Sequence, residues 1–128
     1  MTKGIRVFIV EDEEAILHIL AEELTESGFS IVTAGSGEEA IRMLELEASS
    51  YKALITDVNL SGDVTGWDVG KYAREMNDRI AVVYMTGASA HDWASRGVPN
   101  SLLMLKPFAV AQAVTAVAQL VNAAAILL

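Results

Sequence analysis

Apolar runs of strand length alternate along this chain with segments whose apolar residues recur at helical spacing. The runs are rich in branched residues and predict buried strands at residues 5–10, 30–34, 51–56, 80–85 and 101–105. The helical periods predict helices at residues 14–27, 36–47, 67–76, 90–95 and from 108 onward. Regular alternation of this kind predicts an α/β fold, in which right-handed crossovers place helices on both faces of a parallel sheet.

Local signals mark where two of these helices begin or end. Gly28 stands where the first helix should stop. Ser36 is placed to cap the second helix, and Glu39 three residues later predicts a reciprocal capping box.

The last segment, from Phe108 to Leu128, contains no charged residue and could be mistaken for a membrane span. Its polar residues nevertheless form one helical stripe and its valines an opposite one. The polar stripe is Gln112, Thr115, Gln119 and Asn122, and the apolar stripe is Val110, Val114, Val117 and Val121. The pattern favours an amphipathic helix packed on the sheet over a transmembrane helix.

The chain has 128 residues, which suits a single domain with a substantial core. Its formal net charge of -8 argues against a nucleic-acid-binding surface. It contains no cysteine, so disulfides and thiolate metal sites are excluded, and a reducing cytoplasm fits this composition. The N-terminal residues run straight into a strand pattern and do not resemble a signal peptide.

Three acids and a lysine follow predicted strands. Glu11 and Asp12 come after the first strand, Asp57 after the third and Lys106 after the fifth. Because the carboxyl ends of parallel strands meet at one edge of a sheet, these side chains should share a site. Clustered carboxylates repel one another, which favours a hard divalent cation such as Mg²⁺, and the lysine could then pair with a bound anion such as a phosphoryl group.

Together these segments resemble the receiver domains of two-component response regulators, the CheY-like superfamily. The motifs are Val10-Glu11-Asp12-Glu13, Ile55-Thr56-Asp57, Met85-Thr86-Gly87 and Leu105-Lys106-Pro107-Phe108. Four motifs in this order at strand ends are specific, and the resemblance covers nearly the whole chain. It implies a single receiver domain over residues 1–128, built as a doubly wound (βα)5 sandwich with strand order 2-1-3-4-5.

The resemblance also implies a phosphoacceptor that catalyses only its own phosphorylation and dephosphorylation. Asp57 would take a phosphoryl group from a sensor histidine kinase or a histidine phosphotransfer protein. The implied Mg²⁺ ligands are Asp12 and Asp57 directly, Glu11 directly or through water, and the backbone carbonyl of Asn59.

Two further residues would bind the transferred group. The resemblance implies that Thr86 donates a hydrogen bond to one phosphoryl oxygen and that Lys106 pairs with another. It also implies that Asn59 and Ala88, each two residues beyond a site residue, control the approach of water to the acyl phosphate.

This chain departs from the family pattern in the loop after Asp57 and in the fifth strand. Ser61 stands where the family usually has proline, and Gly66 lies one residue farther along than is common. Leu103 stands where many receivers carry the aromatic residue that turns inward with the threonine. A switch could still operate if Thr86 moves toward the phosphoryl group and draws the following turn with it.

Several alternatives remain open. The acids at residues 11–13 could be an ordinary solvated helix start. The chain could be a stand-alone regulator or a receiver module cut from a hybrid sensor kinase or larger regulator. A phosphohydrolase of the aspartyl-phosphate type would use Asp57 too, but such enzymes generally want a second acid where this chain has Asn59. A degenerate receiver that only binds partners would be expected to lack one of the acids or Lys106.

A partner surface is predicted on the first helix. Ala15, His18, Ile19 and Glu22 form a stripe separate from the leucines that should face the sheet. In related receivers this helix and the turn after the lysine, here Pro107-Phe108, meet the helical bundle of the kinase. Ile19 is therefore predicted to be either a hydrophobic docking anchor or a stray surface residue. A weak homodimer is a further possible assembly.

Overall fold

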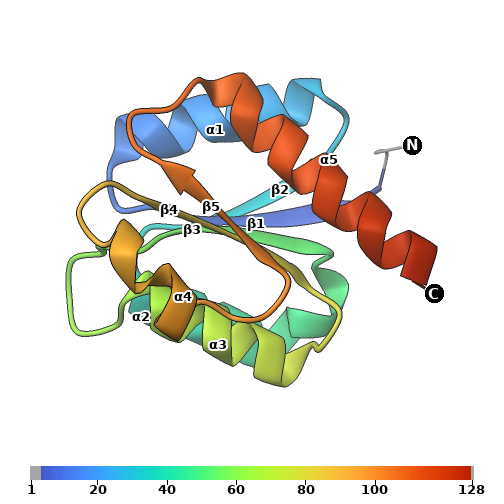
Figure 1. Cartoon of the computed structure of the whole chain (residues 1–128). Coiled ribbons are helices and arrows are strands. Elements are labelled where there is room, and N and C mark those ends of the chain that lie inside the picture. The colour runs from blue at the N-terminus through green and yellow to red at the C-terminus, as the bar shows by residue number, and fades with distance from the viewer. Residues whose placement is uncertain (1–3, 128) are drawn as a thin grey trace.

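The computed structural model describes residues 4–127 and consists of a parallel sheet between two layers of helices (Figure 1). The strand order is β2-β1-β3-β4-β5, as the resemblance implies. The strands are β1 (Arg6–Val10), β2 (Ser30–Ala34), β3 (Ala53–Asp57), β4 (Ala81–Thr86) and β5 (Ser101–Leu105). The helices are α1 (Glu14–Glu26), α2 (Gly37–Glu47), α3 (Gly66–Met76), α4 (Trp93–Arg96) and α5 (Val110–Leu127), with 3₁₀ turns η1 (Ala48–Ser50) and η2 (Ala90–Asp92).

The sheet separates two hydrophobic clusters. Helices α1 and α5 cover one face, and α2, α3 and α4 lie on the other (Figure 1). Every residue of the central strands β3 and β4 is buried, whereas the edge strands β2 and β5 include exposed positions. Burial on both faces explains why the central strands appear in the sequence as continuous apolar runs.

The ends of α1 and α2 follow the predicted signals, with one exception. Gly28 adopts a φ of +99° after α1, a conformation that glycine adopts without strain. The hydroxyl of Ser36 accepts a hydrogen bond from the Glu39 N–H at 3.1 Å and caps α2. The Glu39 carboxylate, however, accepts from the Gly35 N–H at 2.8 Å, one residue before the donor of a standard capping box.

A complete capping box occurs instead at α3, where it was not predicted. The Thr65 hydroxyl accepts from the Asp68 N–H at 3.2 Å, and the Asp68 carboxylate accepts from the Thr65 N–H at 2.9 Å. The box fixes the start of α3 directly after the loop that follows β3.

The helix predicted at residues 90–95 is present as two short helical pieces. A 3₁₀ turn, η2, leads into a single α-helical turn, α4, whose Trp93 indole donates to the Ser101 hydroxyl at 2.9 Å. The turn ends at Gly97, where a Cβ atom would lie 2.4 Å from Cδ1 of Trp93. The indole thus packs against Gly97 at a position where a larger residue would clash.

Helix α5 has the predicted two-sided character. Ala113, Ala116 and Val117 are buried against the sheet, while the polar stripe from Gln112 to Asn122 is exposed. Within residues 4–127, no helix is both long enough and apolar enough to cross a membrane.

Candidate phosphoacceptor and metal site

The predicted acids meet at the carboxyl edge of the sheet. Asp57 is the last residue of β3 and is 5% exposed, and Glu11, directly after β1, is 1% exposed. One carboxylate oxygen from each of Glu11, Asp12 and Asp57 lies within 4.8 Å of the others. Parallel pairing of β1 with β3 brings them together, because it pairs Val10 with Thr56 and so places the residues that follow each, Glu11 and Asp57, at the same edge of the sheet.

Lys106 joins the acids from the end of β5. Its ammonium nitrogen lies 3.3 Å from Oε1 of Glu11 and 3.2 Å from Oδ2 of Asp57. One lysine therefore bridges two buried carboxylates, and the nearby Asp12 adds a third negative charge. The cluster carries an excess of negative charge at its centre.

Burial and this excess of charge both act on the pKa of Glu11. Burial and the neighbouring charge of Asp57 raise the pKa of Glu11 to about 7, although a hydrogen bond from the Glu13 N–H and the ammonium of Lys106 act in the opposite direction. For Lys106, burial alone would lower the pKa, but the charges of Asp57 and Glu11 raise it instead. Lys106 thus stays charged, while Glu11 is held near its titration point.

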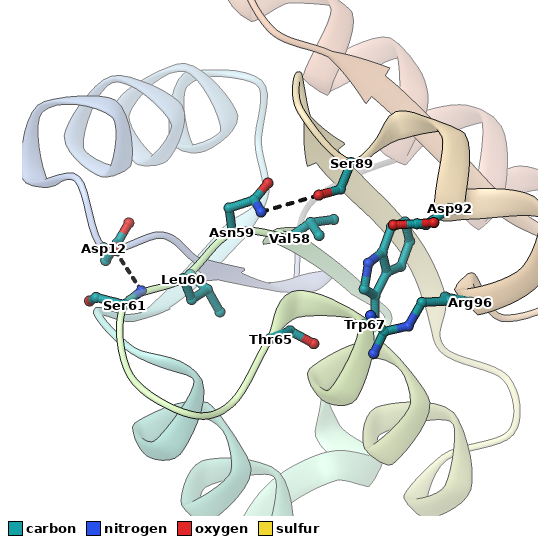
Figure 2. Close-up of a pocket in the computed structure, with 10 residues that line it drawn as sticks. All are labelled: Asp12, Val58, Asn59, Leu60, Ser61, Thr65, Trp67, Ser89, Asp92 and Arg96. Atoms are coloured by element: carbon teal, nitrogen blue, oxygen red, sulfur yellow. Dashed lines mark hydrogen bonds between the residues drawn. The ribbon is translucent and has the colours of Figure 1, made fainter.

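Asp12 lies at the exposed rim of the cluster. Its Oδ2 accepts a hydrogen bond from the Ser61 N–H at 2.9 Å, a contact that Figure 2 shows at one side of the pocket. Partial burial opposes ionisation of Asp12, but the hydrogen bonds from Ser61 outweigh it and lower the pKa. A proline at position 61, the usual family residue, has no N–H to donate, so the serine ties this loop to the acidic cluster.

The loop after β3 is held at two more points. Oε2 of Glu38 accepts from the Asp63 N–H at 3.0 Å, next to Gly62 with a φ of +98°. Gly66 packs against the backbone of Asp57, where a Cβ would lie 2.0 Å from the Asp57 carbonyl oxygen. Although Gly66 lies one residue farther along the chain than is common in the family, it therefore still packs closely against the backbone of Asp57.

Thr86, the last residue of β4, is fully buried and belongs to a ring of hydrogen bonds. Its hydroxyl donates to Oδ1 of Asn59 at 3.0 Å and accepts from the Ser89 N–H at 3.1 Å. The Asn59 amide nitrogen in turn donates to the Ser89 hydroxyl at 3.2 Å. The side chain of Asn59 is thus engaged with Thr86 and Ser89.

Sequence reasoning did not identify Ser89. The available signal was weak: a serine three residues after the threonine can donate its N–H back to that hydroxyl, a local pattern common in turns.

A pocket of about 420 Å³ opens between the loop after β3 and the segment of η2 and α4. Figure 2 shows Asp12 and Ser61 on one side of it and Ser89, Asp92 and Arg96 on the other.

Leu103 occupies the place of the missing aromatic residue. It pairs in register with Tyr84 of β4 and packs at the edge of the cluster that contains Tyr84 and Trp67. The Tyr84 ring is fully buried, and its hydroxyl accepts from the Val98 N–H at 3.1 Å. The aromatic side chain in this part of the core is therefore fixed on β4 and not on β5.

The predicted partner stripe borders a second, mostly apolar groove. Ile19 is 51% exposed, while Leu20 and Leu24 face the core as expected. The groove has a volume of about 450 Å³. It is lined by Ile16, Ile19, Leu20, Lys106, Pro107, Phe108 and Val110. Of the four residues of the predicted stripe, Ile19 therefore lines this groove together with the turn after the lysine, and Ala15, His18 and Glu22 are not among the lining residues.

Taken together, the five-stranded fold and the acid–lysine cluster at its switch point define the phosphoacceptor module of two-component signalling. Residues 7–118 match the family model of the response regulator receiver domain, and the chain belongs to this family. A crystal structure of a response regulator receiver protein from Sinorhizobium medicae has a TM-score of 0.90 at 37% identity and covers 94% of this chain and 97% of that one.

Two other relatives illustrate how such domains are used. The transcriptional regulatory protein CusR of Escherichia coli is 28% identical over 109 residues, which are 84% of this chain but 47% of CusR. The receiver domain of a sensor histidine kinase from Pseudomonas aeruginosa, described with a magnesium ion in its active-site cleft, has a TM-score of 0.78 at 18% identity, with 93% and 98% coverage. The chain thus spans about half the length of CusR, a regulator it matches.

Proposed function

We propose that Asp57 is the phosphoacceptor. Its carboxylate oxygen would form a bond to phosphorus while the phosphorus–nitrogen bond of a phosphohistidine breaks. The electron pair of that bond stays on the imidazole nitrogen, which takes up a proton. The observation that carries the proposal is the placement of Lys106, 3.2 Å from Asp57 within a buried cluster of acids.

We further propose that Glu11, Asp12 and Asp57 hold Mg²⁺, together with the backbone carbonyl of Asn59. Three carboxylates on one site suit a hard cation with oxygen ligands, and a cation there would offset the burial and the charge of Asp57 that raise the pKa of Glu11. When bound, the ion supplies positive charge to the carboxylates and to the phosphoryl oxygens. The magnesium described for the Pseudomonas receiver supports this assignment.

Lys106 and Thr86 would hold the phosphoryl group. The Lys106 ammonium lies close enough to Asp57 to pair with an oxygen of the group after transfer. The Thr86 hydroxyl, at the end of the neighbouring strand, would donate to another oxygen. Catalysis would then depend on positioning and charge neutralisation, and the domain would promote only its own phosphorylation and dephosphorylation.

The groove between α1 and the start of α5 is our proposed contact surface for the phosphodonor. A helix of a sensor histidine kinase or phosphotransfer protein would lie in it, with Ile19 as an apolar anchor beside Lys106.

We propose that residues 1–128 act as one receiver domain in the cytoplasm, alone or within a longer regulator. A phosphohydrolase is not favoured, because Asn59 replaces the second acid and its amide is bound to Thr86 and Ser89.

Incubation with Mg²⁺ and acetyl phosphate, followed by intact mass measurement, tests the acceptor. Wild type should gain one phosphoryl group and Asp57→Asn should gain none. Asp63→Asn, which changes an exposed acid in the following loop, is the matched control and should be phosphorylated like wild type. Equal labelling of wild type and Asp57→Asn would refute the assignment.

A further inference from the structure

The ring formed by Thr86, Asn59 and Ser89 links the buried end of β4 to two surface segments. Thr86 is fully buried, Asn59 is exposed in the loop after β3, and Ser89 immediately precedes η2. Figure 2 shows Asn59 and Ser89 meeting at the wall of the pocket beside the acids. The two hydrogen bonds of Asn59 therefore join the loop after β3 to the segment from Thr86 to Ser89.

The Thr86 hydroxyl can donate only one hydrogen bond at a time. A threonine hydroxyl has one proton, and here Thr86 donates it to Oδ1 of Asn59 at 3.0 Å. The Ser89 N–H is donated to the same hydroxyl and so occupies one of its acceptor positions. Thr86 cannot donate to a phosphoryl oxygen until its bond to Asn59 is broken.

Breaking that bond also affects Ser89. When the bond breaks, Oδ1 of Asn59 loses its donor, Thr86. The nitrogen of the same amide group donates to the Ser89 hydroxyl. Ser89 caps η2, where its carbonyl accepts from the Asp92 N–H at 3.0 Å, and η2 continues directly into α4. A change in the ring therefore reaches α4 over only a few residues of chain.

We propose that Asn59 is a positioning residue that holds the Thr86 hydroxyl in the unphosphorylated arrangement. Capture of the phosphoryl group by Thr86 exchanges the Asn59 bond for a phosphoryl bond and releases Ser89. This inference rests on the proposed role of Thr86, and it gives the chain a route from site to surface that does not need an aromatic residue at Leu103.

The test measures the affinity for beryllofluoride, a phosphoryl mimic that is not hydrolysed, at saturating Mg²⁺ by ¹⁹F NMR. Asn59→Ala should bind the mimic about fivefold more tightly, because it removes one neutral hydrogen bond that competes with the mimic for the Thr86 hydroxyl. Ser89→Ala removes only the anchor of the Asn59 amide and should tighten it by about twofold. Asn122→Ala, a change in an exposed residue of α5, should leave the affinity unchanged.

A double-mutant cycle separates positioning from a merely structural effect. In a Thr86→Ala background the hydroxyl is absent, so Asn59→Ala should no longer tighten binding. In a Thr86→Ser background, where a hydroxyl remains, the tightening should return. Unchanged or weaker binding by Asn59→Ala, or tightening that persists without the Thr86 hydroxyl, would overturn the proposal.

The beryllofluoride affinities also distinguish a failure of the phosphoacceptor assignment from a failure of the role of Asn59. If wild type binds beryllofluoride no better than Asp57→Asn does, the phosphoacceptor assignment fails, and the positioning role of Asn59 fails with it. If wild type binds normally and Asn59→Ala has the same affinity, the phosphoacceptor assignment stands and only the role of Asn59 is refuted.

Discussion

The two halves of the site are held together by different forces. In the charged half, three carboxylates that follow or end β1 and β3 meet Lys106, which follows β5, and the pKa of Glu11 is raised to about 7. In the neutral half, Thr86 and Ser89 meet Asn59 from the loop after β3 through three ordinary hydrogen bonds. A bound cation and anion would offset the charges of the charged half, whereas the neutral half contains no charged side chain to offset.

The sharpest test of the charged half is the pH dependence of stability. The folded-state pKa of Glu11 lies above its unfolded value of 4.5, so between pH 4.5 and about 7 the native state keeps a proton that the unfolded chain has lost. The free energy of unfolding should therefore fall by about 3 kcal/mol as pH rises through this window, by linkage.

Denaturant unfolding at several pH values checks this, with wild type compared with Glu11→Gln. The neutral glutamine should remove the slope, and saturating Mg²⁺ should flatten it in wild type. Glu26→Gln, at the exposed end of α1, serves as the control and should keep the wild-type slope. A slope that survives in Glu11→Gln would mean that another group causes it.

Removal of Asp12 should weaken metal binding while the fold persists. Asp12→Ala deletes one proposed ligand and also frees the Ser61 N–H, so the Mg²⁺ dissociation constant should rise by about 10- to 100-fold. The rate of phosphorylation by acetyl phosphate should fall with it. A Mg²⁺ titration of Asp12→Ala beside Asp63→Ala provides the comparison, and equal affinities would contradict the assignment of Asp12.

Docking should depend on the face that borders the charged half. Ile19→Glu places a charge in the groove beside Lys106 and should weaken phosphotransfer from the cognate kinase by about 1 to 3 kcal/mol of binding. Leu46→Glu on α2 is the matched control, since Leu46 is 84% exposed on the opposite face. Phosphorylation by acetyl phosphate should be unaffected in both variants, and kinase transfer that is equally fast in both would leave Ile19 an ordinary surface residue.

The smallest expected effect concerns the neutral half. Ala88 is exposed next to Ser89, and we expect its small side chain to leave the approach of water to the acyl phosphate open. Ala88→Leu should slow loss of the phosphoryl group by about two- to fivefold, because a larger side chain excludes water. The decay of the phosphorylated mass after removal of donor measures this, and an unchanged half-life would refute it.

The charged half was predictable from sequence because topology creates it. Parallel strands all end at the same edge, so Glu11, Asp57 and Lys106 could be placed together from the strand pattern alone. The strand order itself came from the resemblance to a family. The helix predicted at residues 90–95 differed in type, because a 3₁₀ turn covers Ala90–Asp92 and the α-helix covers Trp93–Arg96.

The neutral half was not predictable for the opposite reason. The Thr86–Asn59 bond joins residues 27 positions apart, and the Asn59–Ser89 bond joins residues 30 positions apart. The hydrophobic period of the sequence does not predict such contacts, because they depend on how two irregular loops close over the sheet edge. The same holds for Ser61 and Asp12, which are 49 positions apart.

The Ser61 contact has a consequence for measurement. Because the backbone N–H of Ser61 is donated to the Asp12 carboxylate, its exchange with solvent deuterium reports whether that oxygen still accepts the bond. A receiver with proline at this position has no amide proton there and lacks such a reporter. In this chain the exchange rate of one loop amide can therefore be followed as a gauge of the acidic cluster, without any label attached to the protein.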